Sequence, residues 1–371
     1  MNNEILGYAV PSANSDLIPY SFTRRVPRAD DVVIEILYCG ICHTDIHYVK
    51  NDWGRSIFPL VPGHEIIGRV IDVGENVTLF KPGDNVGVGC MVDSCQHCTS
   101  CKEGLEQYCE ERPTYTYSSR DRQDNTVTYG GYSEKILVSE KFVLRIPDGL
   151  DLKGAAPLLC AGITTWSPLQ HWGVEKGTNV GVIGLGGLGH MAIKLAKGLG
   201  ANVTLFTRTP EKEQDAYRLG ADNVIISTDK VQMNKSNNQY DLIIDTVPYV
   251  HNLNPYLPSL KIDGTLVLVG LLHNIEPTLN SIPLVNGRKS VAGSSIGGII
   301  ETQELLDFCD GFGITSDIEL IKIQDVNEAY KRMLKSDVKY RFVIDMASLK
   351  FWWTRRESNS YQQLAKLLVS H

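Results

Sequence analysis

Short apolar runs separated by turns dominate the first third of the chain. Residues 32–37 and 66–73 are rich in β-branched side chains, which predicts strands. Residues 81–84 have turn composition and lead into 85–88, another predicted strand. Short strands at this spacing predict an antiparallel, barrel-like domain.

From about residue 154 the pattern changes to strands that alternate with helices. Apolar runs predict strands at 179–183, 203–206, 224–226, 242–244 and 266–269. Helical spacing predicts helices over 188–199 and 211–219. This alternation predicts a parallel sheet with right-handed crossovers, which we place at residues 155–290. The chain then returns to the first domain over 291–348 and ends there in a predicted strand at 340–344.

A glycine-rich loop lies between the first strand and the first helix of this second domain. It has the form G-x-G-x-x-G and consists of Gly184, Leu185, Gly186, Gly187, Leu188 and Gly189. Glycines at this spacing permit a tight turn and a close approach of the backbone to a pyrophosphate. The strand, loop and helix in this order predict a dinucleotide site.

The end of the next strand distinguishes NAD from NADP. An NAD site places a carboxylate there to bind the ribose hydroxyls, whereas this chain has Thr207. Arg208, Thr209 and Lys212 follow, and these side chains suit a 2′-phosphate that a carboxylate would repel. We therefore predict NADP(H) as the cofactor.

Four cysteines, Cys95, Cys98, Cys101 and Cys109, form a C-x2-C-x2-C-x7-C cluster. Thiolates this close together can converge on one tetrahedral Zn²⁺. In a chain of 371 residues the spacing indicates a closed structural zinc site rather than a disulfide framework. Three further cysteines, Cys39, Cys90 and Cys309, are predicted to be buried thiols.

Composition narrows the class of protein. Hydrophobic residues make up 43% and charged residues 21%, as in an ordinary globular enzyme with room for two domains. The net charge of −7 argues against a nucleic-acid partner. No apolar run is long enough to span a membrane, and the first residues have no signal-peptide pattern. We therefore expect a cytoplasmic enzyme with no membrane partner.

Specific motifs occur in order around the remaining candidate ligands. They are C-G-I-C-H-T-D-I-H at 39–47, G-H-E at 63–65, P-L-L-C-A-G-I-T at 157–164, the glycine loop, and Y-R-F-V-I-D at 340–345. Over residues 3–349 the chain resembles the zinc-dependent medium-chain alcohol dehydrogenases. It is most similar to the cinnamyl alcohol dehydrogenase branch and its bacterial broad-range aldehyde reductases. The resemblance implies a GroES-like catalytic domain over 1–154, with a zinc lobe at about 90–112, and a Rossmann domain.

The resemblance also implies the roles of individual residues. Cys42, His64 and Cys160 would bind a catalytic zinc ion, Glu65 would exchange with water at the metal, and Asp45 would accept from His64. Thr44 and His47 would relay the proton from the substrate hydroxyl toward solvent. Further residues would line the cofactor: His43, Thr164, Thr246, Gly270, Ser294, Ser295 and Ile296. The family also implies a homodimer, formed through the cofactor domains.

The resemblance implies an alcohol or aldehyde as the substrate, and the sequence leaves its identity open. Trp53, Tyr115, Leu271 and Ile296 could form an apolar wall. The plant lignin enzymes generally carry Trp where Tyr115 aligns, so we expect a broad range of aldehydes rather than strict coniferyl specificity. The alternatives are an NAD-dependent polyol or formaldehyde–glutathione dehydrogenase, a non-enzymatic zinc-binding module, and an inactive relative. We assign no function to the extension at 349–371.

Overall fold

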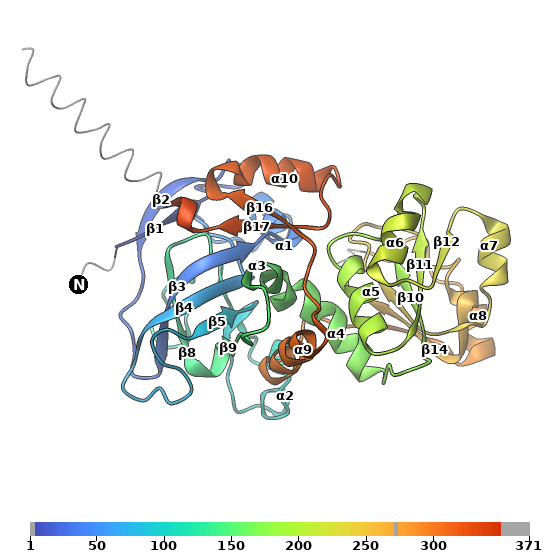
Figure 1. The fold of residues 1–371 in the computed structure, drawn as a ribbon, viewed down its shortest axis with the longest axis horizontal. Helices are drawn as coiled ribbons and strands as arrows, with labels where there is room; N and C mark the ends of the chain where they lie inside the picture. The colour runs from blue at the N-terminus through green and yellow to red at the C-terminus, as the bar shows by residue number, and fades with distance from the viewer. Residues whose placement is uncertain (1–3, 271–273, 350–371) are drawn as a thin grey trace, which may run out of the picture.

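The computed structural model describes residues 4–270 and 274–349 and consists of two lobes side by side (Figure 1). Leu271 and all of the C-terminal extension except Leu349 lie outside the described residues. None of the helices within the described ranges is long and apolar enough to cross a membrane.

The first lobe is built on a seven-stranded sheet. Its strands, in spatial order, are β16 (Ile318–Lys322), β17 (Arg341–Asp345), β3 (Asp31–Gly40), β4 (Ile66–Val73), β5 (Asn85–Val88) and β9 (Leu144–Arg145), and β8 (Lys135–Ser139) also pairs with β3. All pairs are antiparallel except β16 with β17. Two two-stranded antiparallel sheets complete the lobe: β1 (Glu4–Ala9) with β2 (Ile18–Thr23), and β6 (Met91–Asp93) with β7 (Thr114–Tyr115). The predicted antiparallel domain is confirmed.

Short helices surround this sheet. They are α1 (His43–Lys50), α2 (Thr99–Lys102), α3 (Leu152–Ala155) and α10 (Val326–Leu334). One side of α10 is buried on the lobe through Val326, Ala329, Tyr330 and Met333, and its polar side faces solvent. The strand β17 follows α10, so the end of the described chain lies in this lobe (Figure 1).

The second lobe is a six-stranded sheet in which every neighbouring pair is parallel. Its spatial order is β12 (Asn223–Ile226), β11 (Asn202–Thr207), β10 (Asn179–Ile183), β13 (Tyr240–Asp245), β14 (Leu260–Leu268) and β15 (Ser290–Gly293). Its helices are α5 (Gly189–Gly198), α6 (Glu213–Leu219), α7 (Lys230–Lys235) and α8 (Ser281–Gly287). The strand order reverses between β10 and β13. In such sheets a ligand binds in the crevice at the carboxyl ends of the strands at this point.

Two helices lie where the lobes meet: α4 (Ala161–His171) and α9 (Ile299–Phe312) (Figure 1). Trp166 of α4 packs against Phe308 of α9, with ring centroids 4.7 Å apart. Nine residues of α4 are buried, since the helix is covered on several sides. The carboxyl edge of the parallel sheet therefore faces the first lobe across a packed junction.

Candidate active site

Three predicted metal ligands come from separate segments and meet in the first lobe. Cys42 precedes α1, His64 lies in the loop before β4, and Cys160 precedes α4. All three are buried, and with Glu65 they present ligand atoms that lie within 4.8 Å of one another. The Sγ atoms of Cys42 and Cys160 are 3.8 Å apart.

This geometry fits a zinc ion. Two thiolates bound tetrahedrally at about 2.3 Å lie about 3.8 Å from each other. His64 Nε2 is buried and has no hydrogen-bond partner within the described chain. An unpartnered buried nitrogen is costly unless something binds it, so a metal ion at this point accounts for its orientation.

The other nitrogen of His64 is held by a buried carboxylate. His64 Nδ1 lies 3.2 Å from Asp45 Oδ1. The same carboxylate accepts hydrogen bonds from the Cys42 amide at 2.9 Å, the Gly63 amide at 3.1 Å and the Tyr117 hydroxyl at 2.7 Å. Four donors therefore fix the carboxylate, which in turn fixes the imidazole with Nε2 free for the metal. Sequence reasoning did not identify Tyr117.

Glu65 is completely buried and forms an ion pair with Arg341 at the start of β17. Burial raises the pKa of Glu65 to about 7, although the nearby guanidinium acts in the opposite direction. The carboxylate occupies the space next to Gly40, where a Cβ atom would overlap it. Its Oε2 atom is buried and has no partner in the described chain, so it is available to a ligand.

Arg341 links this carboxylate to the dinucleotide loop. A Cβ atom on Gly187 would lie 2.8 Å from the Arg341 Cδ atom and 3.0 Å from its Nη1 atom. The side chain is only 4% exposed. Sequence reasoning noted the Y-R-F-V-I-D motif but assigned this arginine no role. A basic residue directly before the apolar run 342–344 of a predicted strand was the available signal.

The glycine loop lies at the carboxyl end of β10. Gly184 has φ +86°, a conformation that side chains other than glycine rarely adopt. A Cβ atom on Gly189 would overlap the Gly184 carbonyl oxygen, whereas a Cβ atom on Gly186 would meet nothing within 4 Å. The open space at Gly186 is what a bound pyrophosphate needs.

This difference predicts that alanine substitutions at Gly189 and Gly186 affect different properties of the protein. Gly189→Ala is expected to lower the free energy of unfolding by about 1–3 kcal/mol, because the loop and helix must separate. Gly186→Ala should leave stability unchanged within about 0.5 kcal/mol and still weaken dinucleotide binding. Thermal unfolding and cofactor titration of both variants measure this. Equal stability losses would contradict the geometry.

A cavity of about 710 Å³ extends from this loop along the edge of the parallel sheet. The predicted residues that line it are His43, Gly184, Leu185, Gly186, Gly187, Thr207, Arg208, Thr209, Lys212 and Thr246. Lys212 Nζ donates to the Leu185 carbonyl at 2.9 Å, and Thr246 Oγ1 donates to the Ile183 carbonyl at 2.8 Å. Burial lowers the pKa of Lys212, and Arg208 acts in the same direction. Burial likewise lowers the pKa of His43.

Other predicted cofactor residues lie outside the wall of this cavity: Thr164, Leu188, Gly189, Gly270, Ser294, Ser295 and Ile296. Gly189 and Leu188 form the turn into α5, and Thr164 is buried in α4. Ser295 donates its amide to the Tyr108 hydroxyl at 3.1 Å. Ile296 lines a small space with Cys90 and Leu159.

The predicted relay residues lie on α1. His47 Nδ1 lies 2.8 Å from Asp52 Oδ2, and both side chains are partly exposed. The His47 ring packs on Trp53, with centroids 5.0 Å apart. Thr44 is half-buried on the same helix, and Tyr115 is half-buried on β7. The structure therefore joins His47 to solvent through Asp52, a contact absent from the sequence prediction.

The four-cysteine cluster also converges on one point. Its ligand sulfurs lie within 4.8 Å of one another, and Cys95 Sγ is 3.8 Å from Cys101 Sγ. Backbone amides of Cys98 and Cys95 point at the sulfurs of Cys95 and Cys109. Amide hydrogen bonds lower the pKa of Cys98 to about 6. These features fit a structural zinc ion held by thiolates.

All nine cysteines are free. Cys39 and Cys309 are buried, as predicted. The prediction was wrong for Cys90, which is only partly buried, because it lies in the short connection between β5 and β6 rather than within a strand. Its sulfur faces the carbonyl of Leu159 at 3.8 Å.

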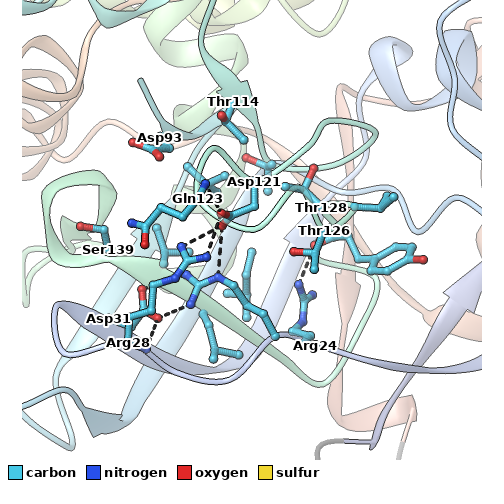
Figure 2. A pocket seen from close by; sticks show the side chains of 18 of the residues that line it. Arg24, Arg28, Asp31, Asp93, Thr114, Asp121, Gln123, Thr126, Thr128 and Ser139 are labelled. Atoms are coloured by element: carbon cyan, nitrogen blue, oxygen red, sulfur yellow. Dashed lines mark hydrogen bonds and ion pairs between the residues drawn. The ribbon is translucent and has the colours of Figure 1, made fainter. Parts of the chain in front are cut away.

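A second cavity, of about 90 Å³, lies elsewhere in the first lobe. Figure 2 shows that the side chains of Arg28, Asp31 and Asp121 in its wall lie close to one another. Arg28 pairs with Asp121 at 2.8 Å, and Arg25 pairs with Asp31. This network ties the segment before β3 to the loop that carries Asp121, and it is structural.

Comparison with known proteins places this arrangement in a family. Residues 28–148 match the alcohol dehydrogenase GroES-like domain, and residues 187–311 match the zinc-binding dehydrogenases. The chain is 50% identical over 349 residues to probable mannitol dehydrogenase 1 of Stylosanthes humilis, covering 94% of this chain and 98% of the relative. It is 50% identical over 339 residues to the aldehyde reductase YahK of Escherichia coli (strain K12), and the match covers 91% of this chain and 97% of the relative.

Solved structures give the same result. The cinnamyl alcohol dehydrogenase of Helicobacter pylori, solved in complex with NADP(H), superposes with a TM-score of 0.87 at 42% identity. The match covers 94% of this chain and 99% of that chain. With the ligand set and the glycine loop described above, these similarities decide the family. This chain belongs to the zinc-dependent medium-chain alcohol dehydrogenases, in the branch of the cinnamyl alcohol dehydrogenases.

Proposed function

We propose that this chain transfers hydride between NADP(H) and a primary alcohol or its aldehyde, and that it works mainly as a broad-range aldehyde reductase. The observation that carries the proposal is the unpartnered Nε2 of His64 beside Cys42 and Cys160. A cavity that begins at the glycine loop and ends at Arg208 lies in the same junction. An aldehyde reductase and an NADP(H)-bound enzyme among the relatives support it.

The proposed chemistry divides between cofactors and protein. Zinc bound by Cys42, His64 and Cys160 supplies a Lewis acid for the substrate oxygen, and the nicotinamide supplies or accepts the hydride. Asp45 orients His64, so that its Nε2 keeps one direction. Thr44 and His47 relay the proton, which enters from solvent by way of Asp52 when the aldehyde is reduced and leaves by the same route when the alcohol is oxidised.

Arg208 is proposed to bind the 2′-phosphate, together with Thr207, Thr209 and Lys212. Arg208→Ala is expected to lower kcat/KM for NADPH by about tenfold or more, because a charge-assisted contact is worth about 1.5–3 kcal/mol. The value for NADH should change by less than about threefold. Steady-state kinetics with both cofactors measure this, and equal losses would contradict the assignment.

The initial rate with cinnamaldehyde tests the proposal as a whole. We expect fast oxidation of NADPH and slow oxidation of NADH by zinc-replete protein. A preference for NADH would overturn the choice of cofactor and leave the zinc chemistry in place. Absence of turnover with cinnamaldehyde and with short aldehydes would contradict the proposed reductase.

A polyol substrate is the second candidate, because one relative is a probable mannitol dehydrogenase. Mannitol with NADP⁺ and with NAD⁺ belongs in the same assay. Faster turnover of mannitol than of any aldehyde or its alcohol would favour a polyol as the substrate. Trp53, Tyr115 and Ile296 are proposed to form an apolar pocket wall, which favours aldehydes over a polyol.

We also propose a homodimer in the cytoplasm. The strand β15 ends the six-stranded sheet, and the side chains of Ile282 and Val285 on α8 are 64% and 75% exposed. An edge strand beside exposed apolar residues is a common self-association surface. Light scattering coupled to size exclusion measures the mass of the assembly.

The proposed location in the cytoplasm is supported by the cysteines, because nine cysteines without a disulfide suit a reducing compartment. The division at 1–154, 155–290 and 291–348 stays a proposal.

A further inference from the structure

A buried carboxylate beside the cofactor cavity has no role in the proposed function. Asp245 ends β13 and is 1% exposed. The next residue along the chain, Thr246, and the facing residue His251 line the same cavity as Arg208 and Lys212, so the carboxylate lies beside the cavity wall. Its Oδ1 accepts a hydrogen bond from the Val247 amide at 3.1 Å. Its Oδ2 is buried and faces a single polar atom among the described residues, Nε2 of His251 at 3.2 Å.

His251 also lines this cavity, and both of its ring nitrogens face acceptors. Nδ1 lies 2.8 Å from the Tyr249 carbonyl oxygen, and Nε2 faces the Asp245 carboxylate. A neutral imidazole carries only one N–H and can satisfy only one of these acceptors. The imidazolium carries an N–H toward each of them. The hydrogen bond to Asp245 raises the pKa of His251, while partial burial and Arg208 act in the opposite direction.

The charge on this pair bears on the choice of cofactor. An uncompensated carboxylate buried beside the cavity wall repels a phosphate dianion and suits free ribose hydroxyls. We propose that His251, as an imidazolium, neutralises Asp245 and so acts as a positioning residue for NADP(H) specificity. This inference rests on the proposed function and deepens it, because it adds a determinant two strands away from the Arg208 site.

Binding of adenosine fragments tests the inference without chemistry at the zinc. The probes are 2′,5′-ADP and 5′-AMP, which differ by the 2′-phosphate, titrated calorimetrically into zinc-loaded protein. His251→Gln is expected to weaken 2′,5′-ADP by about fivefold and 5′-AMP by less than about twofold. His251→Gln combined with Asp245→Asn should restore the wild-type ratio of the two affinities, because the repelling charge is gone. His171→Gln, an exposed histidine outside the cavity, is the matched control.

The pH dependence supplies a second readout. The groups that face His251 are Asp245 on β13, Arg208 after β11 and, nearby, the hydroxyl of Tyr256. From about pH 7 to about pH 9 the 2′-phosphate stays a dianion. The wild-type preference for 2′,5′-ADP should fall with rising pH as His251 loses its proton. In Asp245→Asn the preference should be at least as large and nearly flat.

Each possible result of these titrations either supports or contradicts the inference. Equal weakening of both probes by His251→Gln, or a ratio that the substitution leaves unchanged, would overturn the inference. A lower preference for 2′,5′-ADP over 5′-AMP in Asp245→Asn would also overturn the inference. This second test remains valid even if His251→Gln fails to fold. A wild-type protein with no preference for 2′,5′-ADP would refute the NADP(H) assignment itself, so the two failures are distinguishable.

Discussion

Cys160→Ala is expected to abolish turnover, by at least about a thousandfold, and to leave the four-cysteine site intact. The thiolate of Cys160 lies 3.8 Å from that of Cys42 and faces the unpartnered nitrogen of His64. Without it the remaining protein ligands are too few for a stable site, and polarisation of the substrate oxygen is lost. That polarisation is worth several kcal/mol, and about 4 kcal/mol corresponds to a thousandfold in rate.

Elemental analysis beside the kinetics makes this prediction specific. Wild-type protein should contain about two zinc ions per chain, and Cys160→Ala about one. Cys309→Ala is the matched control, because Cys309 is an equally buried thiol in the core near α4. It should lose about 1–2 kcal/mol of stability and keep its zinc and its turnover. Full activity in Cys160→Ala, or loss of both ions, would contradict the proposed division of the cysteines.

The fold was largely predictable because its strongest signals are local. Each predicted strand of the parallel sheet is an apolar run and appears in the structure, and all except the half-buried edge strand β12 are largely buried. The strand β15 was missed, since Ser290–Gly293 is an edge strand with exposed ends and no apolar run. The helix α7 was missed because it is short and has one buried residue, Met233.

The candidate site was predictable as far as its residues sit in motifs. Cys42, His64 and Cys160 were predicted as ligands, and the structure brings them together, while their roles stay predictions. Tyr117 and His251 were not identified, since each acts through a carboxylate that is distant in sequence or lies on another element. Pairing of this kind depends on the register of the packed elements, which periodicity does not specify.

The second large effect is expected from Arg341→Met. This substitution should lower the free energy of unfolding by about 3–5 kcal/mol. The guanidinium is the ion-pair partner of Glu65, whose carboxylate is completely buried. Removing one member of a buried pair leaves an uncompensated charge. Arg332→Met is the matched control, because Arg332 pairs with Glu319 at a partly exposed site and should cost less than about 1 kcal/mol.

Combining Arg341→Met with Glu65→Gln separates two functions of the arginine. The double variant should recover most of the lost stability, since no charge is left unpaired in the interior. It should still bind NADPH more weakly than wild type, because the guanidinium that packs beside Gly187 is also absent. Chemical denaturation and cofactor titration measure the two quantities separately. Recovery of both would mean that Arg341 serves only to balance Glu65, whereas recovery of stability alone would make it the link between the metal site and the dinucleotide loop.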